Sequence, residues 1–142
     1  MAVTLGPLDL VVVDSLETAL HTHFGWSRFR AGQRPVVEAV LSGRDALAVL
    51  PTGGGKSLCY QLPALIREGL VVVISPLVAL MEDQVLQLSR RGIAAACLHA
   101  GLDPGRRQQA MAALRDESLR LLYLAPERLQ GEATQRLSLI HI

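Results

Sequence analysis

The sequence is poor in the features that mark several other classes of protein. It has only two cysteines, Cys59 and Cys97, and their spacing fits neither a metal motif nor a redox pair, so both are expected to be small buried side chains. No apolar run approaches the roughly 18 residues of a membrane-spanning helix. The first cationic side chain is Arg28, so the first 27 residues lack the basic start of a secretory signal. We expect a cytoplasmic protein, associated with the nucleoid if its source is bacterial, and no membrane partner.

Neither sign of charge dominates, since 14 Lys and Arg residues against 13 Asp and Glu residues give a formal net charge of +1. This value neither requires nor excludes a nucleic-acid partner, and any basic surface must be local. Half of the residues are apolar, which is enough for a substantial core. The length corresponds to one domain or to part of one.

The most informative stretch is residues 49–58, where an apolar run ends in three glycines followed by Lys-Ser. A polyphosphate needs several backbone N–H groups converging on it, and β-carbons would block that approach. A helix that starts near Lys56 adds the positive end of its dipole. The pattern departs from the strict phosphate-loop motif only at Leu50, where glycine is expected. The candidate nucleotide-binding residues of this loop are Thr52, Gly53, Gly54, Gly55, Lys56 and Ser57.

Lys56 is the only lysine, since the other 13 of the 14 Lys and Arg residues are arginine. Lysine is a compact charge on a flexible stem, whereas the wider guanidinium would crowd a tight loop. We therefore expect Lys56, the candidate catalytic residue, to contact the β- and γ-phosphates of ATP. Ser57 is the expected ligand of Mg²⁺. The alternative is a glycine-rich turn before an ordinary helix.

A second concentration of unusual residues lies upstream, where three aromatic residues fall within residues 24–29. An aromatic ring can stack on a nucleobase, and a nearby amide can pair with a donor and an acceptor on the edge of the base. Trp26 and Gln33 are the candidates for these two roles. The alternative is a hydrophobic anchor for an N-terminal helix.

The rest of the chain alternates between apolar strands and amphipathic helices. Helices are expected at residues 8–23, 35–41, 57–67 and 77–91 and after Pro104, and strands at 46–50, 70–74, 94–98 and 121–124. This order predicts an α/β fold with a parallel sheet covered by helices on both faces, preceded by a short N-terminal helical segment. The loops that follow the strands should share the carboxyl edge of the sheet, where ligands bind in such folds.

Four segments resemble the motifs of one family, the RecQ-type DNA helicases of superfamily 2. Residues 24–33 resemble its adenine-recognition motif, residues 51–63 motif I, residues 72–85 motif Ia and residues 122–129 motif Ib. The resemblance implies a RecA-like fold, ATP and Mg²⁺ as cofactors, and translocation 3′ to 5′ along single-stranded DNA that separates duplex DNA. It adds Arg30 to the adenine site and suggests Ser75, Pro76 and Arg128 as contacts to the DNA backbone. Ser75 could instead only cap a helix, and Arg128 could only pair with Glu127 or solvent.

Two departures from the family pattern concern DNA contacts. Glu82 stands where lysine is expected, and His99-Ala100 stands where Asn-Ser is expected. A third, Trp26 in place of tyrosine, should preserve stacking.

The resemblance also implies parts that lie outside these 142 residues, namely an acidic pair that binds magnesium and a second RecA-like domain with an arginine finger. We expect residues 1–43 to be N-terminal helices with the adenine segment, and residues 44–142 to be an incomplete first RecA-like domain with an unpaired edge strand. Such a fragment should bind nucleotide weakly and hydrolyse none. A non-catalytic nucleotide-binding module, another phosphate-loop enzyme such as a kinase, and an RNA helicase remain as alternatives.

Overall fold

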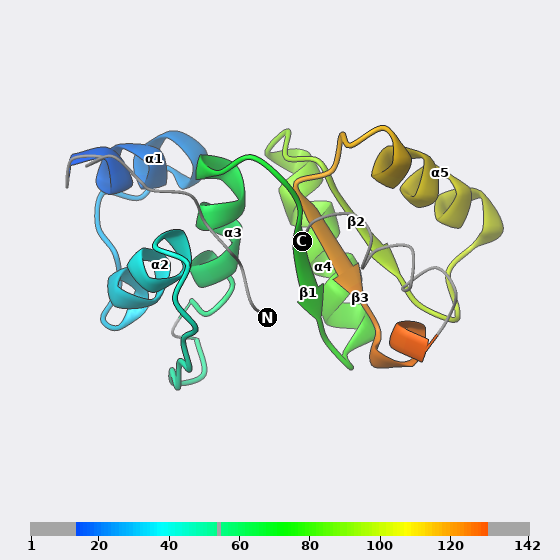
Figure 1. Cartoon of the computed structure of the whole chain (residues 1–142), viewed down its shortest axis with the longest axis horizontal. Coiled ribbons are helices and arrows are strands. Elements are labelled where there is room, and N and C mark those ends of the chain that lie inside the picture. Colours follow the sequence, from blue (N-terminus) through cyan, green and yellow to red (C-terminus); the bar gives the residue numbers. More distant parts are fainter. Residues whose placement is uncertain (1–13, 54, 131–142) are drawn as a thin grey trace. The chain divides into compact units, whose positions relative to one another are not determined.

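The computed structural model describes residues 14–53 and 55–130, and these fall into two compact units, Met1–Glu68 and Gly69–Ile142 (Figure 1). We call them the N-terminal unit and the C-terminal unit. Gly54, the start of the first predicted helix and the chain after residue 130 lie outside the described residues. No helix in the described ranges is long and apolar enough to cross a membrane.

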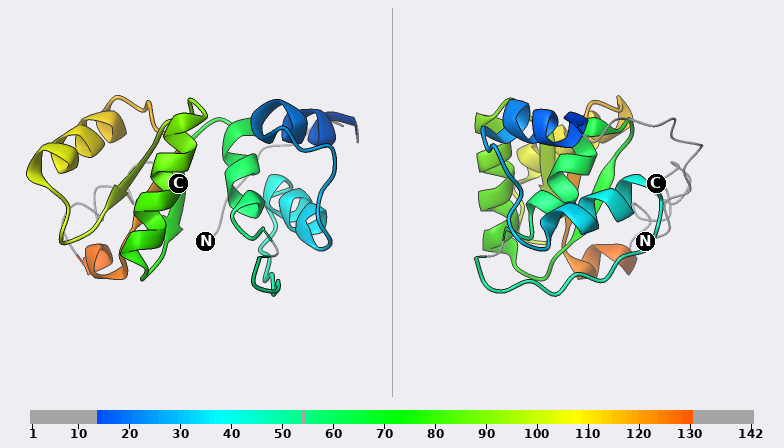
Figure 2. Two further views of the ribbon diagram at one scale, coloured as in Figure 1. Left: turned by 180° about the vertical axis from the view of Figure 1, so that it is seen from behind. Right: turned by 90° about the vertical axis from the view of Figure 1, so that its left-hand side faces the viewer.

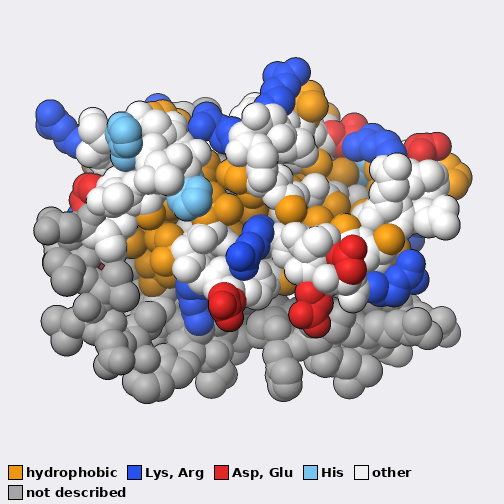
Figure 3. Space-filling view, turned by 90° about the horizontal axis from the view of Figure 1, so that it is seen from above, with side chains coloured by type: hydrophobic (Ala, Val, Ile, Leu, Met, Phe, Trp, Pro, Cys, Tyr) orange, Lys and Arg blue, Asp and Glu red, His pale blue; other side chains and the backbone are white. Residues whose placement is uncertain are grey.

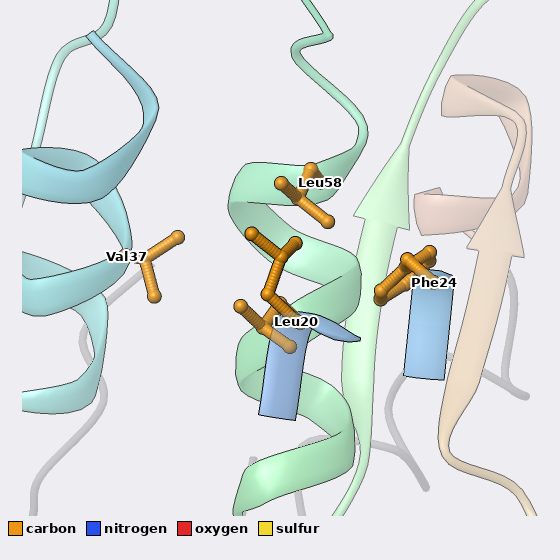
Figure 4. Close-up of a cluster of buried hydrophobic side chains, with 5 residues drawn as sticks. Leu20, Phe24, Val37 and Leu58 are labelled. Carbon is orange, nitrogen blue, oxygen red and sulfur yellow. The ribbon is translucent and has the colours of Figure 1, made fainter. Parts of the chain in front are cut away.

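The N-terminal unit consists of three helices, α1 (Asp14–Phe24), α2 (Gln33–Leu41) and α3 (Leu58–Ile66). Leu20 and Phe24 lie one turn apart on α1, and both are buried against α2 and α3. Figure 4 shows Val37 of α2 pointing toward Leu20 and Leu58. The predicted helices at 35–41 and 57–67 are therefore confirmed, and the helix at 8–23 is confirmed over its described part.

The strand predicted at residues 46–50 is wrong. These residues form neither helix nor strand, and the side chains of Leu47 and Val49 are 94% and 89% exposed. A strand is stable only when its backbone N–H and C=O groups pair with a neighbour. No described strand pairs with this segment, so its apolar composition does not give it strand structure.

The C-terminal unit contains a parallel sheet of three strands, β1 (Val71–Ile74), β2 (Ala95–Leu98) and β3 (Leu121–Leu124), in the order β1-β3-β2. Leu124 is in register with Ile74 on one side and with Leu98 on the other. β3 is central, and all four of its residues are buried. The three strands predicted here are confirmed to within one residue at each end.

Two helices connect these strands, α4 (Val78–Arg90) between β1 and β2, and α5 (Pro104–Arg115) between β2 and β3. The first crossover passes over β3 in one direction and the second returns in the other. Since crossovers between parallel strands are right-handed, the two helices cover opposite faces of the sheet. Figure 2 shows α4 in front of the strands in the view from behind. A parallel sheet with helices on both faces is thus confirmed.

The sheet has an edge strand, β1, and a carboxyl edge where the three strands end. β1 has a neighbour on one side only among the described strands, and Ile74 is 53% exposed. Figure 3 shows one face of the whole chain, on which apolar side chains are exposed among polar and charged ones. The carboxyl ends of the three strands lie at one edge, which brings together the loops after residues 74, 98 and 124 and the 3-10 helix η1 (Pro126–Gln130). The phosphate loop belongs to the other unit, so its predicted place at this edge is not tested.

Candidate nucleotide and DNA sites

The aromatic segment after α1 forms an open pocket in the N-terminal unit. The rings of Phe24 and Trp26 are stacked, with centroids 5.7 Å apart and planes 25° apart. The guanidinium of Arg30 lies over the Trp26 ring, 5.9 Å from its centroid, which is within the range of a cation–π interaction. The side chain of Trp26 is 42% exposed, so part of it is accessible. The pocket has a volume of about 400 Å³ and is lined by Gly25, Trp26, Ser27, Arg28 and Arg30.

Gln33 connects this segment to the glycine loop. Its Oε1 accepts a hydrogen bond from the backbone N–H of Arg30 (2.8 Å), and its Nε2 donates to the carbonyl of Gly55 (2.9 Å). Gln33 is 1% exposed although it is polar, and this burial is consistent with an amide whose two ends both have partners. The sequence predicted that this amide would pair with the edge of a nucleobase. In the structure its two ends instead bond to the backbone of Arg30 and Gly55, and the side chain is buried.

The glycine loop is held from the same side by Arg30, whose Nη1 donates to the carbonyl of Gly53 (2.7 Å). Gly53 and Gly55 have φ angles of +78° and +72°, a left-handed conformation that glycine adopts readily. A β-carbon on Gly55 would lie 2.3 Å from Nε2 of Gln33, whereas one on Gly53 would have no atom within 4 Å. The structure therefore brings Trp26, Arg30 and Gln33 together with two of the three glycines of the loop.

Lys56 and Ser57 form the turn that leads into α3. Lys56 is exposed and Ser57 is half-buried. The turn is closed by hydrogen bonds from the backbone N–H of Leu58 to the carbonyl of Gly55 (3.2 Å) and from that of Gln61 to the carbonyl of Ser57 (2.9 Å). α3 begins directly afterwards, so the first amides of the helix follow the loop as predicted. Thr52 is exposed at the start of the loop, before Gly53.

The candidate DNA contacts lie in the C-terminal unit, at the carboxyl edge of the sheet. Ser75 follows β1, its N–H donates to the carbonyl of Leu124 (3.0 Å), and its hydroxyl accepts from the N–H of Leu77 (3.2 Å). Ser75 thus forms a turn with the residue before α4, and Pro76 lies exposed inside that turn. Arg128 lies in η1, half-buried, and its Nη2 donates to the carbonyl of His99 (3.1 Å).

The two family departures, Glu82 and His99, are in contact with each other. Oε1 of Glu82 lies 3.1 Å from Nε2 of His99 and 3.1 Å from Nη1 of Arg106. The hydrogen bond from His99, followed by that from Arg106, lowers the pKa of Glu82. The sequence identified both departures but not their contact, because the two residues are 17 positions apart, on α4 and after β2.

Cys97 lies beside this pair, so that ligand atoms of Glu82, Cys97 and His99 are all within 4.8 Å of one another. Such a group could in principle hold a metal ion. However, the guanidinium of Arg106 binds the same carboxylate oxygen and opposes a second positive charge there. Burial also raises the pKa of the Cys97 thiol, whereas a metal binds the thiolate. The arrangement favours a hydrogen-bond network over a metal site.

The class of protein follows from comparison with a family model. The chain belongs to the DEAD/DEAH box helicase family, whose model matches residues 30–141. Within this class, the predicted resemblance to RecQ-type helicases is confirmed. The chain is 54% identical over 118 residues to the ATP-dependent DNA helicase RecQ of Synechocystis sp., a match that covers 83% of this chain and 25% of that protein.

Other curated relatives give the same result. The proteins named ATP-dependent DNA helicase RecQ from Pasteurella multocida and Haemophilus influenzae are each 49% identical, over 86% and 78% of this chain. The chain spans only 19% and 18% of their lengths. Among solved structures, the DUF1998 helicase MrfA bound to DNA matches with a TM-score of 0.67, over 96% of this chain and 20% of that one. At 22% identity this likeness supports the fold alone.

Proposed function

We propose that this chain is the nucleotide-binding part of a RecQ-type helicase that hydrolyses ATP to move 3′ to 5′ along single-stranded DNA and so separates duplex DNA. The observation that carries the proposal is the bridge made by Gln33 between the backbone of Arg30 and the carbonyl of Gly55. Because of this bridge, the pocket suited to a base and the loop suited to phosphates belong to one hydrogen-bonded assembly.

In this proposal the site residues of the N-terminal unit divide into those that contact ATP and those that hold the site together. Trp26 stacks on the adenine, while Arg30 and Gln33 hold the segment against the loop. Lys56 contacts the β- and γ-phosphates, and Ser57 holds Mg²⁺. When bound, Mg²⁺ neutralises charge on the transferred phosphate. The backbone of Thr52, Gly53, Gly54 and Gly55 surrounds the phosphates.

The C-terminal unit contributes the DNA contacts. Ser75 and Pro76 form the turn after β1, and Arg128 has a guanidinium oriented by the carbonyl of His99. Contacts to phosphates carry no base preference, which suits a motor that must move along any sequence. We propose DNA, single-stranded and duplex, as the substrate in the cytoplasm, in association with the nucleoid in a bacterium.

Hydrolysis needs further groups that this proposal assigns to a longer protein. They are an acidic pair for magnesium and water, and an arginine finger from a second RecA-like domain. Residues 44–142 would then be the start of the first RecA-like domain, with residues 1–43 as its N-terminal helices and adenine segment. The 142 residues alone should bind ATP weakly and show no steady-state hydrolysis.

The experiment that tests this function uses the protein encoded by the complete reading frame that contains the chain. ATP-dependent unwinding of a DNA duplex with a 3′ single-stranded tail should fall about 100-fold or more in Lys56→Ala, as for other losses of preorganised charge stabilisation. Arg115→Ala, which removes an exposed charge on α5, is the control and should unwind normally. Normal unwinding by Lys56→Ala would contradict the proposal, and a preference for RNA duplexes over DNA would favour an RNA helicase.

A further inference from the structure

The pair of Glu82 and His99 lies next to a candidate DNA contact that it does not itself form. His99 is 5% exposed, and Nε2 of its ring is held by a hydrogen bond with Glu82. The other ring nitrogen, Nδ1, is buried and has no hydrogen-bond partner among the described residues. The orientation of the ring therefore depends on Glu82.

The backbone of the same histidine is one of the groups that hold Arg128. The carbonyl of His99 accepts a hydrogen bond from Nη2 of Arg128 (3.1 Å) and one from the N–H of Leu102 (3.3 Å). A guanidinium is planar, so a hydrogen bond at one of its nitrogens restricts the direction of the whole group. A change in the His99 backbone would therefore turn the Arg128 guanidinium.

Arg106 completes the connection from a third element. It lies in the first turn of α5, and its Nη1 binds the same carboxylate oxygen of Glu82 (3.1 Å). The carboxylate is thus held between α5 and the loop after β2. Through this carboxylate, the His99 ring is held in place by residues of both α4 and α5.

We propose that Glu82 and His99 are positioning residues, which hold the His99 carbonyl in place and thereby direct Arg128 toward the DNA backbone. This inference rests on the proposed DNA contact of Arg128.

The test is binding of the chain to a fluorescent oligothymidine, measured by anisotropy at several salt concentrations. Arg128→Ala should weaken binding about tenfold, on the order of one charge-assisted hydrogen bond. It should also reduce the magnitude of the salt slope by about 0.7, the value for one phosphate contact to single-stranded DNA. His99→Ala should weaken binding at least about twofold and reduce the slope in the same way, because it misdirects Arg128.

The decisive comparison is the double variant. If His99 acts through Arg128, His99→Ala should have no further effect on affinity or on the salt slope in the Arg128→Ala background. His99→Gln, whose longer side chain places an amide N–H near the position of Nε2 and can still donate to Glu82, should restore most of the affinity. Arg90→Ala, which removes an exposed charge at the end of α4, is the control for loss of charge alone and should leave the effect of His99→Ala unchanged.

The outcomes separate the inference from the function on which it depends. If Arg128→Ala binds as the unmodified chain does, the DNA role of Arg128 fails and the inference fails with it. If Arg128→Ala weakens binding but the two substitutions are additive, only the positioning role is overturned. A loss of thermal stability in His99→Ala without a change in salt slope would indicate a purely structural histidine and would also overturn it.

Discussion

Replacing Gly55 by alanine tests the bridge between the base pocket and the phosphate loop. The φ angle of Gly55 is +72°, which costs a non-glycine residue about 1 to 2 kcal/mol. The new methyl group would also lie 2.3 Å from Nε2 of Gln33, a separation that forces the amide away from the Gly55 carbonyl. Leaving a buried amide without its partner costs about 1 to 3 kcal/mol. The expected total is about 2 to 5 kcal/mol of the free energy of unfolding.

Two comparisons isolate the part of this cost that belongs to Gln33. Gly25 has a φ of +75°, and a β-carbon added there would have no atom within 4 Å, so Gly25→Ala measures the backbone strain alone, about 1 to 2 kcal/mol. In a Gln33→Ala background, where both the clash and the hydrogen bond are absent, Gly55→Ala should cost no more than Gly25→Ala.

The assay is urea denaturation followed by the fluorescence of Trp26, the only tryptophan, which lies in the same unit. The difference in cost of Gly55→Ala between the two backgrounds should exceed the uncertainty of additivity, about 0.5 kcal/mol. Equal costs in the presence and absence of the Gln33 side chain would refute the bridge.

Three further predictions concern the core, the acid response and the base pocket. Leu62→Ala, at a fully buried position, should destabilise the N-terminal unit by about 2 to 5 kcal/mol, whereas Leu47→Ala, at a 94% exposed position, should change stability by less than about 0.5 kcal/mol in the same denaturation assay. The hydrogen bond from His99 lowers the pKa of Glu82, so the Glu82 carboxylate stabilises the fold above the pKa of the unfolded chain, and this stabilisation is lost as pH falls through the folded pKa. On acidification, the melting temperature of Glu82→Gln should therefore fall by less than that of the unmodified chain. Equal decreases would contradict this. Trp26→Ala should weaken binding of ADP about tenfold, because stacking on a base contributes about 1 to 3 kcal/mol. Binding of tripolyphosphate, which has no base, should be unchanged when both ligands are measured by calorimetry. Equal weakening of both ligands would place Trp26 outside the base pocket.

The parts of the fold that sequence predicted well are those with a strong local signal. The helix after the phosphate loop has apolar periodicity, and the strands at 71–74, 95–98 and 121–124 are continuous apolar runs near Gly or Pro; the structure has these elements within one or two residues of the predicted bounds. The strand at 46–50 has an equally apolar composition but fails. Its stability would depend on a neighbouring strand, and the sequence of a segment does not reveal whether such a partner is present.

The candidate site shows the same limit. Chemistry alone suggested Trp26 and Gln33 for a nucleotide, the family resemblance added Arg30, and the structure brings these three to the glycine loop. Neither suggested that Gln33 binds the carbonyl of Gly55, 22 residues away, because a long-range hydrogen bond leaves no periodic pattern. The contact between Glu82 and His99 was missed for the same reason, although each residue is separately recognisable as a departure from its family.

The central claim, that residues 52–57 bind the phosphates of a nucleotide, is tested most directly through the single lysine. Lys56 carries the only side-chain amine of the chain, and the α-amine serves as an internal reference. The chain is treated with a limiting amount of an acylating reagent, with and without Mg-ATP, and modification at each amine is measured by mass spectrometry. The account predicts that ATP protects Lys56 and leaves the α-amine unchanged. Equal acylation of Lys56 in the presence of saturating ATP would contradict it.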